Sequence, residues 1–208
     1  MKDHIARRIY HIEVLTPKQA SENLEDDLQK FAEKYTKVLE TGYMACITDN
    51  PMGNLSYQAT EVIPELGLPV PPEQVMIHLN TFHTREQLDE ILDTAARIGV
   101  RYLLTVTGDG SERLPKLTGD AIGMDVRTVT SVELMKYIQK RHPGVFTMGV
   151  AFNPYEPQEH EMEKMRRKIE AGASFIITQP ILGEDARVRK AASLGLPLVV
   201  EAWMSKKI

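Results

Sequence analysis

The sequence predicts an α/β domain of the (β/α)8 TIM-barrel type, and three observations support this fold class. Short apolar runs rich in β-branched residues alternate along the chain with longer segments of helical spacing. Most of these runs are nearly continuous, as expected for strands buried on both faces of a parallel sheet. The links from helix to strand are as brief as residues 99–101, which suits the crossovers that parallel strands require.

Seven apolar runs are expected to form the strands, at residues 9–15, 43–48, 75–79, 102–107, 146–151, 175–178 and 198–202. Helical spacing predicts the main helices at residues 21–39, 84–98, 132–141, 161–171 and 184–193. Thr84 has the side chain of an N-cap, and Gly172 follows a predicted helix as a C-terminal glycine. A chain of 208 residues is short for two domains, so we expect one barrel domain over residues 1–208.

An open doubly wound sheet would show the same alternation of strand and helix. The first strand-to-helix junction carries no glycine-rich dinucleotide fingerprint, and this favours the barrel. The longest irregular stretch, residues 108–130, follows the fourth predicted strand. An irregular stretch of this length in a compact domain usually serves a functional site.

Composition excludes several classes of function. The net charge of −4 gives no electrostatic reason to expect nucleic acid or an anionic membrane as a partner. No window approaches the roughly 18 apolar residues that cross a bilayer, and the charged N-terminus lacks the apolar stretch of a signal peptide. The single cysteine, Cys46, excludes an internal disulfide, so we expect a cytoplasmic protein. Metal-ligand pairs at short fixed spacing are missing, so no metal site is expected.

Polar side chains lie in, or just after, almost every predicted strand. In a parallel barrel the carboxyl ends of the strands carry the active site, and a purely structural core would not require polar residues there. The candidates in chain order are Glu13, Thr48, Asp49, Asn50, His78, Asn80, Thr81, Thr107, Asp109, Asn153, Thr178, Gln179 and Glu201.

Glu13 is the most informative candidate because it lies within the first predicted strand. A carboxylate that faces inward there is costly unless it is paired or functional. An apolar cavity raises the pKa of a carboxyl group, as a general acid near neutral pH requires. The pattern alone equally allows an outward-facing or salt-bridged Glu13. By the same reasoning, Asp109 fits a turn aspartate and His78 fits a core histidine.

Taken together, these motifs resemble the methylenetetrahydrofolate reductase family. Residues 12–18 (Ile-Glu-Val-Leu-Thr-Pro-Lys) resemble its first-strand motif, and residues 78–81 (His-Leu-Asn-Thr) its third-strand motif. Residues 104–109 (Leu-Thr-Val-Thr-Gly-Asp) are similar to the branch that is often fused to a homocysteine methyltransferase domain. Residues 149–154 and 167–180 follow in the family's order and spacing, so the resemblance covers residues 9–200.

The resemblance implies a (β/α)8 barrel that holds FAD near the carboxyl ends of the strands. In the family, NAD(P)H reduces the flavin, which then reduces 5,10-methylenetetrahydrofolate to 5-methyltetrahydrofolate. Glu13 matches the general acid, Asp109 a catalytic aspartate beside flavin and folate, and Gln179 the glutamine that binds folate. The other positions that match cofactor contacts are Thr48, His78, Thr107, Gly108, Asn153 and Lys168.

Two departures from the family keep alternatives open. Residues 49–53 (Asp-Asn-Pro-Met-Gly) replace its usual second-strand sequence, and the sequence stops after the seventh predicted strand, where the family continues with an eighth strand and helix. A fragment, a partner chain over the gap and a reduced relative are all compatible with this ending. The alternatives to a reductase are a flavin-free tetrahydrofolate-dependent methyltransferase and a folate-binding subunit of a one-carbon complex. We expect a homo-oligomer or a subunit of such a complex.

Overall fold

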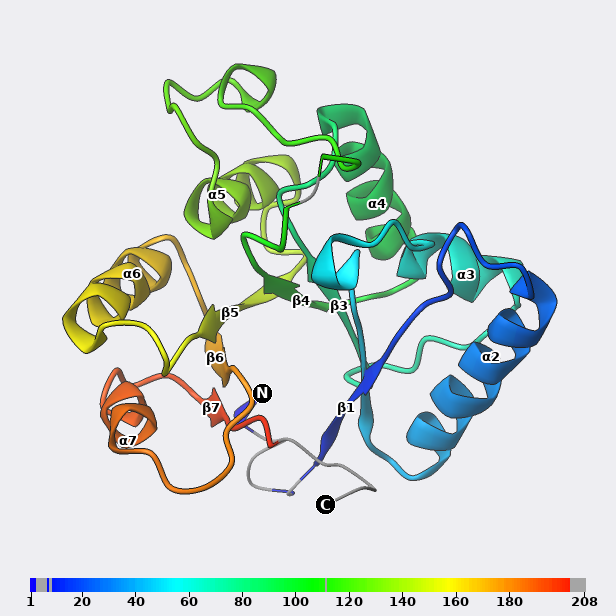
Figure 1. Ribbon diagram of the computed structural model, residues 1–208, viewed down its shortest axis with the longest axis horizontal. Helices are drawn as coiled ribbons and strands as arrows, with labels where there is room; N and C mark the ends of the chain where they lie inside the picture. The colour runs from blue at the N-terminus through cyan, green and yellow to red at the C-terminus, as the bar shows by residue number, and fades with distance from the viewer. Residues whose placement is uncertain (3–6, 8, 111, 203–208) are drawn as a thin grey trace.

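The computed structural model describes residues 1–2, 7, 9–110 and 112–202, and its centre is a parallel sheet with strand order β1-β2-β3-β4-β5-β6-β7. Helices cover the outer face of the sheet (Figure 1). The strands are β1 (His11–Val14), β2 (Met44–Ile47), β3 (Val75–Leu79), β4 (Tyr102–Thr105), β5 (Thr147–Phe152), β6 (Phe175–Thr178) and β7 (Leu198–Val199). The helices are α2 (Leu24–Glu40), α3 (Ala59–Glu65), α4 (Arg85–Arg97), α5 (Ser131–Arg141), α6 (Gln158–Glu170) and α7 (Ala186–Ala192), with short 3-10 turns η1 (Pro51–Gly53) and η2 (Asp120–Ile122).

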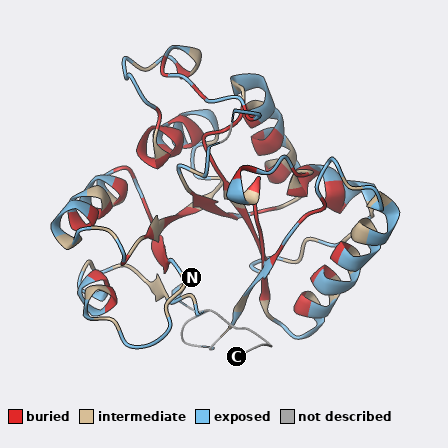
Figure 2. Cartoon of the chain, in the orientation of Figure 1, coloured by how far each residue is buried: buried red, intermediate tan, exposed pale blue. Residues whose placement is uncertain are grey.

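The apolar side chains of the strands divide between two clusters, because successive side chains of a strand point to opposite faces. One set joins the buried faces of the helices in a large outer core. The other set forms a smaller interior cluster, whose buried members come from the strands alone: Met44, Cys46, Met76, Tyr102, Leu104, Phe175 and Ile177. Figure 2 shows the buried residues concentrated in the sheet and in the helix faces that pack on it. The predicted burial on both faces is therefore confirmed for the inner strands β2 to β6, whose residues are mostly buried, whereas the edge strands β1 and β7 are partly exposed.

Local signals explain where several elements begin and end. The Thr84 hydroxyl accepts a hydrogen bond from the Gln87 amide at 3.2 Å, and the Gln87 side chain accepts one from the Thr84 amide at 2.9 Å. This reciprocal capping box starts α4 at Arg85, as the sequence predicts. Gly172 follows α6 with a φ of +99°, a conformation that glycine adopts without steric cost.

The structure differs from the sequence prediction mainly at short elements. Helix α3, with seven residues and Pro64 inside it, was not predicted, because so short a segment shows little helical periodicity. Strand β7 comprises only Leu198–Val199 of the predicted 198–202. The long stretch after β4 remains irregular except for η2, as expected.

The two ends of the sheet, β1 and β7, approach each other without pairing. Figure 1 shows the sheet curling so that both strands lie beside the N-terminus. Within the described part of the chain, no strand joins β7 to β1. The fold is thus a seven-stranded parallel barrel that is open between its first and last strands. None of the described helices is long and apolar enough to cross a membrane.

Candidate functional site

The alternation of side chains places several predicted site residues in the interior of the barrel. Glu13 is the register partner of Cys46, which belongs to the interior cluster. His78 lies two positions after Met76 within β3, so it shares the inward face of that strand. Gln179 directly follows β6 and is exposed, whereas Glu201, two residues after β7, lies near Glu13 and Cys46.

Two carboxyl groups face each other across the open side of this barrel. Burial raises the pKa of Glu13, although part of the residue remains exposed at the barrel opening. The pKa of Glu201 rises to about 7, mainly because of burial and further because of the nearby charge of Glu13. The buried Cys46 thiol lies near both groups, and its pKa is raised by burial and then by their two charges. The interior therefore favours neutral, protonated acids.

His78 carries a neutral imidazole in this interior. Burial lowers its pKa to about 4, and the nearby carboxylate of Asp49 opposes the shift only in part. A neutral ring has one nitrogen that donates a hydrogen bond and one that accepts. His78 can therefore pair with a polar ligand without adding charge to the site.

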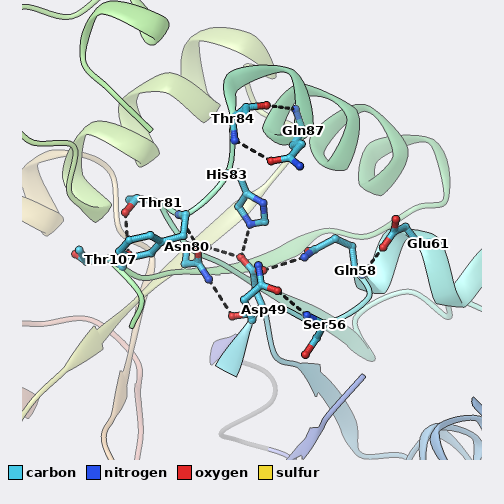
Figure 3. Close-up of polar contacts among 12 residues, drawn as sticks. Asp49, Ser56, Gln58, Glu61, Asn80, Thr81, His83, Thr84, Gln87 and Thr107 are labelled. Atoms are coloured by element: carbon cyan, nitrogen blue, oxygen red, sulfur yellow. Dashed lines mark hydrogen bonds and ion pairs between the residues drawn. The ribbon is translucent and has the colours of Figure 1, made fainter. Parts of the chain in front are cut away.

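Asp49, two residues after the end of β2, is the centre of a hydrogen-bond network at the ends of β2 and β3 (Figure 3). Its carboxylate lies 2.7 Å from His83 Nε2, and it accepts hydrogen bonds from the Asn80 amide at 2.8 Å and from Gln58 Nε2 at 3.1 Å. Asn80 Nδ2 also donates to the Asp49 carbonyl at 2.9 Å. The side chains of Asp49 and His83 are almost completely buried, so the network joins three segments rigidly.

The network extends to the loop that follows β4. Thr81 Oγ1 donates to the Thr107 carbonyl at 2.8 Å. Gly108 has a φ of +85°, and a Cβ atom at this position would lie 2.7 Å from Cβ of Asn80. Only glycine fits so close an approach in this conformation. These contacts hold the backbone that presents Thr107 and Asp109, both of which are exposed beside the barrel opening.

The remaining residues predicted to contact the cofactor differ in whether their polar side-chain groups already have a hydrogen-bond partner in the protein. The Thr48 hydroxyl is buried, and within the described structure it has no hydrogen-bond partner. Asn153 Oδ1 accepts a hydrogen bond from the Tyr155 amide at 3.0 Å and so closes a turn. Lys168 lies in the layer between α6 and β5, where its ammonium group donates to the Ala151 carbonyl at 2.6 Å and burial lowers its pKa. Thr48 is thus free for a ligand, whereas Lys168 is occupied on the helix side of the sheet.

Sequence reasoning did not assign a role to the Asp49–His83 pair. The two residues are 34 positions apart, and His83 lies outside the strands and helices that the sequence predicts. No local pattern marks a pair that forms only when two parallel strands place their carboxyl ends side by side. The sole sequence signal was the gathering of polar residues after the second and third strands.

Comparison with protein families matches residues 1–191 to the family described as methylenetetrahydrofolate reductase. Methylenetetrahydrofolate reductase 2 of Schizosaccharomyces pombe is 29% identical over 114 residues, which cover 49% of this chain and 17% of that protein. Methylenetetrahydrofolate reductase 2 of Saccharomyces cerevisiae is 26% identical over 164 residues, or 71% of this chain and 26% of that protein. The chain therefore spans about a quarter or less of the length of these relatives.

Solved structures resemble the chain in fold. An uncharacterized protein from Clostridium thermocellum, which binds two copies of 5-methyl-5,6,7,8-tetrahydrofolic acid, has a TM-score of 0.56 and 15% identity, covering 96% of this chain and 68% of its own. An aldolase has a TM-score of 0.54 and 20% identity, covering 92% of this chain and 79% of its own. These likenesses support the predicted barrel architecture. Because the family match spans almost the whole sequence, the chain belongs to the methylenetetrahydrofolate reductase family.

Proposed function

We propose that this chain binds a one-carbon tetrahydrofolate in the barrel opening and takes part in the FAD-dependent reduction of 5,10-methylenetetrahydrofolate to 5-methyltetrahydrofolate. The observation that carries the proposal is the inward-facing Glu13, whose pKa is raised by burial, in a chain of this family. The neighbour of similar fold that binds 5-methyltetrahydrofolic acid supports the view that this architecture accommodates such a ligand.

Glu13 is proposed to act as the general acid. Opening of the folate's five-membered ring to a reactive iminium requires a proton on the departing ring nitrogen. A carboxyl group with a raised pKa retains that proton closer to neutral pH than an ordinary glutamate does. Burial alone raises the pKa of Glu13, and the charge of Glu13 in turn adds to the burial that raises the pKa of the nearby Glu201 to about 7. Glu13 can therefore hold the proton and release it to the substrate inside the barrel.

The residues around the opening fit a flavin in part. The unpartnered Thr48 hydroxyl and the neutral His78 imidazole offer hydrogen bonds, and the backbone of Thr107 and Gly108 lies at the same opening. When bound, FAD would supply the hydride that it receives from NAD(P)H. Lys168 would have to leave the Ala151 carbonyl to contribute, so the remaining residues are the stronger candidates.

Two further side chains are proposed to orient the folate. Asp109 is exposed at the opening, where its carboxylate can accept hydrogen bonds from the amide and amine groups of the pterin. Gln179 directly follows β6 and is exposed, and its side-chain amide can both donate and accept hydrogen bonds. Its backbone amide donates to the Phe152 carbonyl at 2.8 Å, which holds the residue in place.

Glu13→Gln tests the proposed role of Glu13. The variant should still bind 5-methyltetrahydrofolate, but folate reduction should slow by about 10²–10⁴-fold, the usual contribution of a positioned acid. Stopped-flow kinetics of the flavin-loaded protein measures the rate, and titration calorimetry measures folate binding. The exposed Glu90→Gln on α4 is the matched control and should keep the parent rate. A parent-like rate in Glu13→Gln would remove Glu13 from the mechanism.

The same preparation separates the reductase from its alternatives. A reductase should take up FAD, turn yellow and oxidise 5-methyltetrahydrofolate with an artificial electron acceptor. Folate binding by a protein that takes up no flavin would instead indicate the flavin-free methyltransferase or the folate-binding subunit. Turnover with a methyl donor then distinguishes those two.

A further inference from the structure

The connection that follows β2 contains two residues with a left-handed backbone. Asn50 has a φ of +44° and Met52 a φ of +57°, a region that favours glycine. Asparagine enters this region more often than other non-glycine residues do, whereas a long apolar residue such as Met52 is uncommon there. Strain of this kind persists only where the surrounding structure enforces it, and it gathers at functional sites.

Hydrogen bonds hold the turn η1 in one conformation. The Gly53 amide donates to the Asn50 carbonyl at 3.1 Å, and the buried Asn50 side chain accepts from the Ser56 amide at 2.9 Å. Beyond the turn, Ser56 forms an antiparallel bridge with Lys18 in the connection after β1. The backbone of Met52 is therefore fixed before any ligand binds.

Met52 stands in solvent at the carboxyl end of the barrel. The residue is 83% exposed, although its side chain is apolar. It follows the last residue of β2 by five positions, and Figure 1 shows η1, in cyan, inside the ring of helices. The same connection begins with Thr48, whose hydroxyl is buried and has no hydrogen-bond partner within the described structure. An unpaired buried hydroxyl indicates a missing ligand or water, so the end of β2 offers a polar and an apolar contact together.

We propose that Met52 packs against the face of a flat heteroaromatic ring bound in the barrel opening, the chemistry shared by the pyrimidine half of a folate pterin and the isoalloxazine of a flavin. The inference rests on the proposed function and adds a contact residue to it. A thioether makes favourable contacts with aromatic rings, and an unbranched side chain adapts to the ring that it meets. Because the turn is already ordered, the contact requires ordering of the side chain alone.

The neighbouring groups suit a planar ring with polar edges. Ligand sites combine apolar walls with a few polar groups that fix the orientation of the ligand. Thr48 and the neutral His78 imidazole offer hydrogen bonds to the heteroatoms at a ring edge, and Met52 then covers the face. Leu15, which directly follows the adjacent strand β1, is 59% exposed and adds apolar surface at the end of that strand. The β1–β2 side of the opening therefore supplies both kinds of contact.

Methyl NMR of the full chain, with methionine labelled by carbon-13 at the methyl group, tests the contact directly. A methyl group above the face of an aromatic ring shifts upfield, so the Met52 signal should move upfield on binding. The signal that is lost in Met52→Leu identifies Met52. FAD alone and 5-methyltetrahydrofolate alone are titrated in separate arms, and the arm that shifts the signal identifies the ring. Met124, which packs against the outer core just after η2, should keep its shift and serves as the internal control.

Two substitutions separate a ligand contact from a structural role. Met52→Gly removes the side chain and relaxes the left-handed backbone, so the thermal midpoint of the chain should not fall. The Kd for the ligand that shifts the Met52 signal should nevertheless rise by about two- to tenfold, the range typical of a lost sulfur–aromatic contact. Met52→Leu keeps an apolar side chain of similar volume and should recover most of this loss. Val126→Ala truncates an exposed apolar side chain in the loop after η2 and should keep the parent Kd.

The outcomes separate this inference from the proposed function. If neither ligand binds the parent chain, the proposed function fails and the contact fails with it. If a ligand binds while the Met52 signal shows no upfield shift, the contact alone is overturned, whatever the variants do. A parent-like Kd in Met52→Gly would also overturn it, because the side chain would then contribute nothing to binding. An upfield shift in the parent together with a raised Kd in Met52→Gly supports it.

Discussion

Asp49 shows how much of the site depends on a single buried residue. Three donors from two segments converge on its carboxylate, Asn80 and His83 from the connection after β3 and Gln58 from the segment before α3 (Figure 3). An ionised carboxylate only accepts hydrogen bonds, so it satisfies all three donors at once. The network fixes the ends of β2 and β3 and, through Asn80, the position of Gly108 in the next loop.

Asp49→Asn should destabilise the protein by about 2–4 kcal/mol, because the new amide group would face donors in a buried network. Equilibrium denaturation in urea at neutral pH measures the change. Asp125→Asn, at an exposed carboxylate, is the matched control and should change the free energy of unfolding by less than about 0.5 kcal/mol. A loss in Asp49→Asn no larger than in this control would show that the network contributes little.

The interior of the sheet is built by close complementarity between neighbouring strands. Gly149 in β5 pairs with Phe175 in β6, and the aromatic ring of Phe175 occupies the space that a side chain at position 149 would need. Phe175 also makes an edge contact with Tyr102 of β4, with ring centroids 6.3 Å apart. A small residue next to a large one thus fills the narrow barrel without voids.

Gly149→Ala should destabilise the fold by about 1–3 kcal/mol, because its Cβ atom would lie 2.0 Å from the Phe175 ring and force it to move. Thermal unfolding measures the effect. In the double variant Gly149→Ala/Phe175→Leu the cost should be smaller than the sum of the two single costs, since the clash disappears. Gly183→Ala, where an added Cβ meets nothing within 4 Å, is the control. Additive costs would contradict the packing argument.

At the scale of the whole molecule, the curl of the sheet brings together residues from its first and last strands. Glu13 and Glu201 are far apart in sequence, yet the charge of Glu13 raises the pKa of Glu201. A group with a raised carboxyl pKa binds more protons when folded than when unfolded. Stability is therefore lost as pH rises from the ordinary glutamate pKa, 4.5, through the folded value of about 7.

Glu201→Gln should remove most of this loss. Between pH 5 and pH 8 the parent protein should lose about 1–2 kcal/mol more stability than the variant, a figure reduced from the full pKa shift to allow for solvent screening. Urea denaturation at the two pH values measures the difference. The exposed Glu159→Gln should retain the parent's dependence on pH. Parallel pH profiles for Glu201→Gln and the parent would show that folding does not raise the pKa of Glu201.

The sequence by itself determined the alternation of strands and helices, the capping of α4 at Thr84 and the family. These features depend on local periodicity and on motifs that are contiguous in the chain, so they can be read without knowing how distant segments meet. The sequence also predicted that Glu13 lies in the first strand, but it did not show whether the side chain points into the barrel or away from it. The alternation from Cys46 and Val14 in the structure shows that Glu13 faces the interior.

Only the tertiary structure decided which polar residues meet. Asp49 pairs with His83, Glu13 lies near Glu201, and the Lys168 ammonium group donates a hydrogen bond to the Ala151 carbonyl. Each of these contacts joins residues from different segments of the chain. Burial and electrostatic interaction depend on distances through space, and these distances are set when the sheet curls and the helices pack against it.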